Sequence, residues 1–154
     1  MRVFVLAPLA LILAVPMPDA PAQAMTVGEA NARFVDQTRI SFSPGHGTQV
    51  SYMRPDGTVF LWYPGNRVVV RGRWLIENRA KSAYLCFQYG ADTYNPVTNQ
   101  SGSSWSCQQA GVFARITVDR VRGDLFGLAN RQAVPFLLTP ERTIIAELKQ
   151  RARP

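Results

Sequence analysis

Two cysteines and one histidine are the residues of this 154-residue chain whose types could support nucleophilic or metal chemistry. A catalytic thiol would need His46 as its base, and the spacing gives no support for that pairing. Metal ligation lacks further ligands, because His46 is the only histidine and there is no second cysteine pair. Two thiols in an oxidising compartment usually pair, and closing a loop of about twenty residues contributes roughly 3 kcal/mol. We therefore expect a disulfide between Cys86 and Cys107.

The remaining polar residues do not form a recognisable catalytic set. His46 lies in Ser43-Pro44-Gly45-His46-Gly47, where the flanking glycines indicate an exposed loop. The central carboxylates are scattered near predicted turns: Glu77, Asp92, Asp119 and Asp124. A glycosidase-like pair among them stays open as an alternative, but the spacing selects none. The sequence thus predicts no catalytic residue, no metal site and no cofactor.

Aromatic side chains crowd the middle of the chain: Phe60, Trp62, Tyr63, Trp74, Tyr84, Phe87, Tyr89, Tyr94 and Trp105. Alternate residues of a strand face opposite sides, so a strand over residues 58–63 is apolar on both faces. One face is core, and the other is either covered by a terminal helix or exposed for binding. Arg67, Arg71 and Arg73 share the alternation, so an aromatic floor with an arginine rim would suit an anionic, partly apolar ligand.

The ligand-binding candidates on this surface are Trp62, Arg71, Arg73 and Tyr89. Simple packing of a small β core is the alternative explanation for the same aromatics.

Residues 1–24 have the pattern of a cleavable secretory signal peptide. Arg2 precedes an apolar run over residues 3–15, which is too short to cross a bilayer, and Ala22-Gln23-Ala24 fits signal peptidase. An uncleaved anchor is the alternative. With cleavage, the mature chain starts near Met25, is not transmembrane, and is periplasmic or secreted.

The formal net charge is +7, and the loss of Arg2 and Asp19 leaves it unchanged. Such a charge favours acidic partners such as anionic lipid, acidic polysaccharide, a phosphate-bearing ligand or an acidic protein. Solubility alone is the alternative reason for it. Nucleic acid is excluded as a partner, because the exported chain has no nucleic-acid motif.

The elements that must position these residues are mostly short strands. Thr26 to Glu29 is a capping box for a helix that ends near Asp36. The predicted strands cover residues 48–53, 58–63, 67–77, 83–89, 103–108 and 112–119, with a loop over residues 41–47 and a long polar loop over residues 90–102. Thr139-Pro140-Glu141 is a helix start. The fold class is mainly β (α+β by count): a small antiparallel barrel or sandwich of about six to eight strands, with a short helix at each end.

We therefore predict one β-rich domain over residues 25–148, followed by a basic tail over residues 149–154. The ordered series Trp62-Tyr63-Pro64-Gly65-Asn66, Gly72-Arg73-Trp74, Leu85-Cys86-Phe87 and Trp105-Ser106-Cys107 resembles small exported proteins of alphaproteobacteria, in families of unknown function. The resemblance covers roughly Thr26 to Cys107. It implies a periplasmic β-rich domain and carries no catalytic residue.

These patterns favour a periplasmic, non-enzymatic binding or interaction module for an unknown small molecule or envelope protein. One alternative is a small hydrolase acting on envelope polymers through carboxylates such as Glu77 or Asp119. Another is a structural envelope-associated protein, held at an anionic surface by its excess of arginine.

Overall fold

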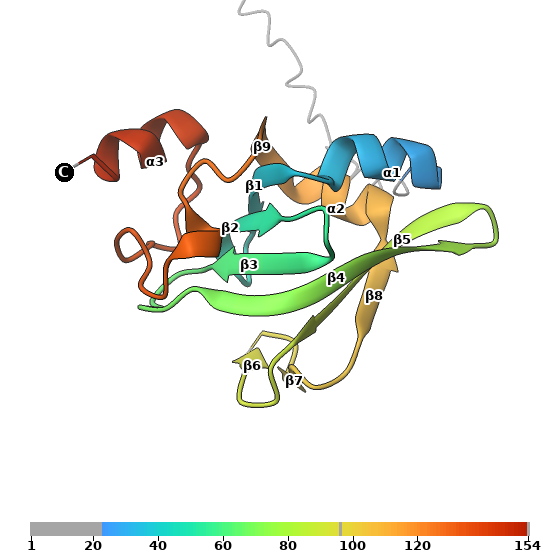
Figure 1. The fold of residues 1–154 in the computed structure, drawn as a ribbon, viewed down its shortest axis with the longest axis horizontal. Coiled ribbons are helices and arrows are strands. Elements are labelled where there is room, and N and C mark those ends of the chain that lie inside the picture. Colours follow the sequence, from blue (N-terminus) through green and yellow to red (C-terminus); the bar gives the residue numbers. More distant parts are fainter. Residues whose placement is uncertain (1–22, 96, 154) are drawn as a thin grey trace, which may run out of the picture.

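A computed structural model describes residues 23–95 and 97–153, and its centre is one antiparallel sheet of seven strands that curls into a half-barrel (Figure 1). The strands lie in the order β8-β5-β4-β3-β2-β1-β9. Their bounds are β1 (Gln37–Ser43), β2 (Gly47–Met53), β3 (Thr58–Trp62), β4 (Val70–Arg79), β5 (Ser82–Tyr89), β8 (Ser106–Gln109) and β9 (Thr117–Arg122). Residues 1–22 of the predicted signal peptide lie outside the described residues.

Three short helices and a small hairpin complete the fold. The helices are α1 (Val27–Phe34), α2 (Ala110–Ile116) and α3 (Ile145–Arg151), and a 3-10 turn covers Leu128–Asn130. The hairpin pairs β6 (Tyr94–Asn95) with β7 (Gln100–Ser101) inside the predicted loop 90–102. The prediction of a mainly β, antiparallel fold with a short helix near each end is confirmed.

The predicted hairpin over residues 48–63 is present as β2 and β3. Pro55-Asp56-Gly57 makes the turn, in which Gly57 has a φ of +82° and the Asp56 carboxylate accepts the N–H of Thr58 at 2.9 Å. The register then fixes which side chains share a face, since Phe60 lies opposite Tyr52 and Arg71.

The two faces of the sheet carry separate apolar clusters. On the face we call the helical face, Met53, Val59 and Trp74 pack against Ala30 and Phe34 of α1 and against α2. On the opposite face, called the C-terminal face, buried sheet residues pack against the chain that follows β9. The sheet residues are Ile40, Val50, Tyr52, Phe60 and Trp62, and the residues that cover them are Phe126, Leu128, Leu138 and Leu148. A strand that is apolar on both faces, such as β3, is therefore explained by a cover on each side.

Helix α1 has the predicted cap. The Thr26 hydroxyl accepts the Glu29 N–H at 3.3 Å, and the Glu29 carboxylate accepts the Thr26 N–H at 2.8 Å. These hydrogen bonds also hold the pKa of Glu29 below its ordinary value. The cap fixes where the chain enters α1 and so where residues 23–25 lie.

Helix α2 joins the two edges of the sheet, because it follows β8 at one edge and leads into β9 at the other (Figure 1). The prediction of a strand over residues 112–119 is wrong for Val112–Ile116, which are helical. Phe113 packs on Phe87 of β5 with ring centroids 5.2 Å apart, and this tertiary contact outweighs the β preference of the segment.

The last helix begins at Ile145, so the helix start predicted at Thr139-Pro140 is wrong. The Pro140 carbonyl accepts the Thr48 N–H, and the Glu141 carbonyl accepts the Thr48 hydroxyl. These carbonyls are bonded to β2 and are not available for a helical turn. Helix α3 reaches Arg151, so it includes the first residues of the segment assigned to the basic tail.

Candidate anion-binding site

The candidate Trp62 lies in the core. Its side chain is fully buried, its indole N–H donates to the Phe136 carbonyl at 3.0 Å, and its ring meets Phe126 and Phe136 edge-on. The C-terminal chain covers the surface that the sequence suggested as a binding floor. In this structure Trp62 therefore packs against Phe126 and Phe136 in the core and is not exposed to a ligand.

The other three candidates lie on two different faces of the sheet. Arg73 lies opposite Gln88, while Tyr89 lies opposite Gly72, so Tyr89 points to the helical face and Arg71 and Arg73 to the C-terminal face. Arg73 donates to the Gln88 amide oxygen and stacks over Trp105 at 5.5 Å. Tyr89 is half-buried, and desolvation raises the pKa of its hydroxyl. The four candidates do not converge on one ligand site.

His46 joins the β1–β2 turn to the β6–β7 hairpin. Ser43 Oγ lies 3.2 Å from Nδ1, and Asn95 Nδ2 lies 3.2 Å from Nε2. The Asn95 amide oxygen accepts the N–H groups of Val97 and Thr98, so the amide NH₂ must face the ring. Nε2 is then an acceptor, and Nδ1 carries the proton that it donates to Ser43. A histidine in this tautomer cannot take the Ser43 proton.

The carboxylates named as hydrolase candidates each bond to a nearby group of the protein. Glu77 on β4 pairs with Arg79, and Asp119 on β9 accepts the N–H of Ile145 at 3.0 Å. Strands β3, β2 and β1 separate the two acids in the sheet. Asp124 caps the 3-10 turn through the N–H of Leu128. The structure does not bring these acids together as a pair.

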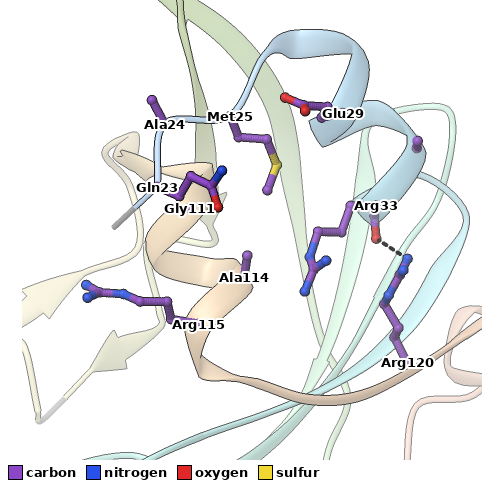
Figure 2. Close-up of a pocket in the computed structure, with 10 residues that line it drawn as sticks. Gln23, Ala24, Met25, Glu29, Arg33, Gly111, Ala114, Arg115 and Arg120 are labelled. Atoms are coloured by element: carbon purple, nitrogen blue, oxygen red, sulfur yellow. Dashed lines mark hydrogen bonds between the residues drawn. The ribbon is translucent and has the colours of Figure 1, made fainter. Parts of the chain in front are cut away.

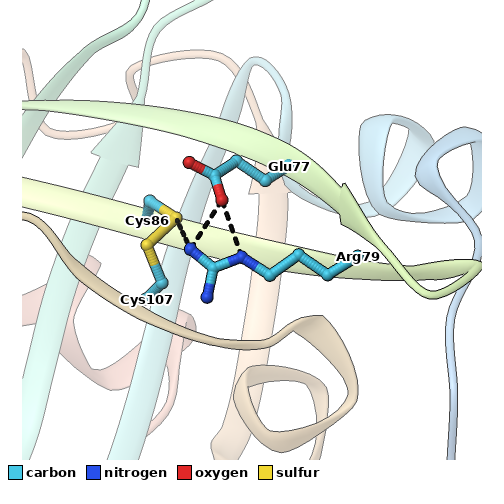
Figure 3. The surroundings of a disulfide bond; sticks show 4 residues. All are labelled: Glu77, Arg79, Cys86 and Cys107. Carbon is cyan, nitrogen blue, oxygen red and sulfur yellow. Dashed lines mark hydrogen bonds and ion pairs between the residues drawn. A yellow bond between two sulfur atoms is a disulfide. The ribbon is translucent and has the colours of Figure 1, made fainter.

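The predicted disulfide between Cys86 and Cys107 is present and links directly opposed residues of β5 and β8 (Figure 3). Figure 3 shows the Arg79 guanidinium beside it, bonded to the Glu77 carboxylate and 4.0 Å from Cys86 Sγ. Glu77 and the two sulfurs lie close enough to hold a metal ion, but sulfurs joined to each other have no thiolate to offer one. The cluster therefore braces the edge of the sheet.

A pocket of about 510 Å³ lies between residues 23–25, α1, α2 and β9 (Figure 2). We call it the arginine pocket, because its charged lining residues are Glu29, Arg33, Arg115 and Arg120. Figure 2 shows Arg33 extending from α1 into the space before α2, with Arg120 beside it, whereas Arg115 points away from α1. Its volume is in the range of small-ligand sites.

A further arginine, Arg39, does not line the pocket but lies next to two of its lining residues, Arg33 and Arg120. Arg39 on β1 lies directly opposite Arg120 on β9, so the two side chains share the helical face. Arg120 in turn donates to the Arg33 carbonyl at 3.4 Å. Three arginines from α1, β1 and β9 thus converge at one end of the half-barrel, although like charges directly opposite each other weaken a strand pair.

Arg39 is a buried cation with only 5% of its surface exposed. Its Nη1 donates to the Phe113 carbonyl and to the Thr117 hydroxyl, both at 3.1 Å, and its guanidinium lies between the rings of Phe34 and Phe113. Burial, opposed by Tyr89 and reinforced by the like charge of Arg33, lowers the pKa of Arg39 to about 10. The fold therefore holds this charge in a place that disfavours it.

Within residues 23–95 and 97–153, no ion pair neutralises Arg33, Arg39 or Arg120, and the three ion pairs found join Arg54 to Asp56, Arg79 to Glu77 and Arg122 to Asp36. The Nε atoms of Arg33 and Arg39 are buried without a hydrogen-bond partner. Of the three, Arg39 is buried, Arg33 is half-buried and Arg120 is exposed, and a buried charge in a protein is normally paired. The unpaired guanidinium groups make this end of the molecule suited to a negatively charged group.

Comparison with protein-family models, curated proteins and solved structures finds no match to this chain. In the described part of the chain, every helix is too short or too polar to cross a membrane. The site therefore has to be interpreted from its own residues.

The sequence reasoning missed the arginine pocket because its residues are far apart in the chain. Arg33 lies in a helix, Arg39 in a strand that the sequence did not reveal, and Arg120 in an edge strand. They meet only in the folded protein, where the β1–β9 pairing places Arg39 opposite Arg120. The excess of arginine was a signal, but it did not indicate which arginines share a site.

Proposed function

We propose that this protein is a periplasmic, non-enzymatic binding domain that holds an anionic ligand, or an anionic group of an envelope partner, in the arginine pocket. The observation that carries the proposal is the convergence of Arg33, Arg39 and Arg120 without a carboxylate partner. The export pattern of the sequence and the disulfide support the periplasmic location.

The chemistry of guanidinium groups favours carboxylate or phosphoryl oxygens. Each arginine presents a planar fork of N–H donors, and charge-assisted hydrogen bonds to such oxygens are about twice as strong as neutral ones. The Arg33 Nε is already desolvated and unpartnered, so a bound anion would supply the acceptor that it lacks. Ala32, Ala114 and Met25 add apolar lining, which suits a ligand that is partly apolar.

Glu29, the only acidic residue among the described lining residues, offsets one of the three arginine charges and leaves the pocket net positive. Its carboxylate is fixed by the backbone N–H and the hydroxyl of Thr26, both at 2.8 Å. It therefore serves the helix cap, and an incoming anion meets a net positive pocket.

The test is calorimetric titration of the exported protein with inorganic phosphate and with citrate at low ionic strength. Loss of one guanidinium contact is expected to weaken binding at least tenfold, about 1.4 kcal/mol, in Arg33→Gln and in Arg120→Gln. The matched control is Arg142→Gln, which removes one exposed charge from the segment before α3. It should change the affinity less than twofold.

Two outcomes would refute the proposal. If neither phosphate nor citrate binds, the pocket is not an anion-binding site. If all three substitutions weaken anion binding equally, net charge alone attracts the anions. Binding that occurs only to vesicles of anionic lipid, and is lost steeply with salt, would favour the structural envelope-associated protein instead.

A further inference from the structure

One wall of the arginine pocket is formed by the residues at the predicted cleavage site. Gln23, Ala24 and Met25 line the pocket, and the Gln23 carbonyl packs directly on Gly111 of α2 (Figure 2). A Cβ at position 111 would overlap this carbonyl, so only glycine allows the chain to approach the helix so closely. The Ala-x-Ala pattern ends at Ala24, so the predicted cut falls inside this wall.

Met25 is held in place by contacts that do not need the preceding residues. Its carbonyl accepts the N–H of Ala83 on β5 at 2.7 Å, and the next residue, Thr26, is fixed in the capping box. Its side chain packs against the apolar cluster of the helical face. Removal of residues 1–24 would therefore leave Met25 at the edge of the pocket.

We infer that cleavage of the Ala24–Met25 bond opens one side of the site, where the α-ammonium group of Met25 becomes its fourth cationic lining group. The inference rests on the proposed function. In the cleavage, a peptidase hydrolyses the amide bond: water supplies the hydroxyl of the new Ala24 carboxyl group and one proton to the Met25 nitrogen. Ionisation of that carboxyl group then supplies the second proton, which converts the new amine to the ammonium group. The step also removes the uncharged Gln23–Ala24 wall.

The surroundings of the new ammonium group define its effect. The charged side chains that line the pocket are Glu29 and Arg33 from α1, Arg115 from α2 and Arg120 from β9. On β5, the residue that contacts Met25 is the uncharged Ala83. The Glu29 carboxylate keeps its negative charge in its hydrogen bonds to Thr26, so the added ammonium charge offsets it and raises the net positive charge that an incoming anion meets. An α-amino group loses its proton around pH 8, so this contribution is present at pH 7 and absent above pH 9.

The chain allows this charge to be removed selectively, since Lys81 and Lys149 are its only lysines. In the exported Lys81→Arg/Lys149→Arg protein, the terminal amine is the one aliphatic amine that acetylation can modify. Mass spectrometry first verifies that the chain starts at Met25 and carries a single acetyl group. Phosphate titrations at pH 7 and pH 9.5 then compare the acetylated and free forms, with Arg33→Gln in the same background as the reference for loss of the pocket.

Acetylation is expected to weaken phosphate binding about fivefold at pH 7 and not at pH 9.5. Equal affinities at pH 7, with binding still lost in Arg33→Gln, would overturn the inference and leave the proposed function standing. A mature chain that begins at another residue would also overturn it. If the free form does not bind phosphate or citrate, the proposed function fails and the inference fails with it.

Discussion

Replacement of Arg39 by methionine is expected to leave the protein as stable as before, or about 1 kcal/mol more stable. Burial lowers the pKa of Arg39 to about 10 on folding, and each pH unit of this decrease corresponds to 1.36 kcal/mol, so the buried charge costs the folded state about 3 kcal/mol. The folded pKa lies below the unfolded one, so this cost is complete below about pH 10 and decreases as the pH rises towards the ordinary pKa of arginine.

Methionine removes this cost and keeps much of the packing. Its thioether chain can lie between the rings of Phe34 and Phe113, where the guanidinium group lies now. The hydrogen bonds to Phe113 and Thr117 are lost at about 1 kcal/mol each, but the Thr117 hydroxyl already donates to the Phe113 carbonyl, so neither group is left without a partner.

The assay is urea unfolding of the disulfide-intact protein at pH 7, without phosphate or citrate. A loss of more than 2 kcal/mol would refute the reasoning, because it would show that Arg39 is a satisfied structural cation. The same variant should show a smaller thermal stabilisation by citrate than the wild type, because Arg39 lies beside Arg33 and Arg120 without lining the pocket itself.

Three further substitutions test other parts of the structure. Cys107→Ser should lower the free energy of unfolding by about 3 kcal/mol, which reductant should reproduce in the wild type; an unchanged midpoint in urea would contradict this. His46→Ala should speed amide hydrogen exchange across residues 90–102 and not in β2 or β3, whereas a uniform increase would argue against a local link. Gly47→Ala should lower the free energy of unfolding in urea by more than about 2 kcal/mol, because its φ is +67° and a Cβ would lie 2.7 Å from Pro140. The control is Gly28→Ala on α1, where a Cβ enters open space, and it should stabilise the protein slightly.

The parts of the fold that followed from the sequence are those with local signals. The capping box at Thr26, the hairpin around Asp56-Gly57 and the disulfide each depend on residues whose roles are set by close neighbours or by simple pairing. These signals survive folding because no distant contact competes with them.

Strand β1 was missed because three of its four buried positions are polar and only Ile40 is apolar. The sequence predicted a loop from Ser41 onwards, yet Thr38, Arg39 and Ser41 are all buried. Thr38 is satisfied by hydrogen bonds to Gly123 and Leu125, which lie more than 80 residues away. Ile40 and Phe42 are its only apolar side chains, so the alternation is too short to distinguish the strand from a loop.

The sequence also did not show which of the candidate residues share a face of the sheet. Period-two alternation indicates which residues of one strand share a face, but it does not give the register between strands. The pairing of Tyr89 with Gly72, and not with Arg73, moves Tyr89 to the other side of the sheet. The pairing of Arg39 with Arg120 creates the arginine pocket by the same mechanism.

The length of α2 sets a limit on the shape of the sheet. Seven strands about 4.8 Å apart would place β8 and β9 about 29 Å from each other in a flat sheet. Helix α2 has seven residues and spans about 10 Å, so it can connect these two edges only if the sheet bends until they approach. The helix thus acts as a tie whose length determines the curvature. Because Gly111 and Ala114 of the same helix line the arginine pocket, lengthening α2 would let the sheet flatten and would widen the pocket at the same time.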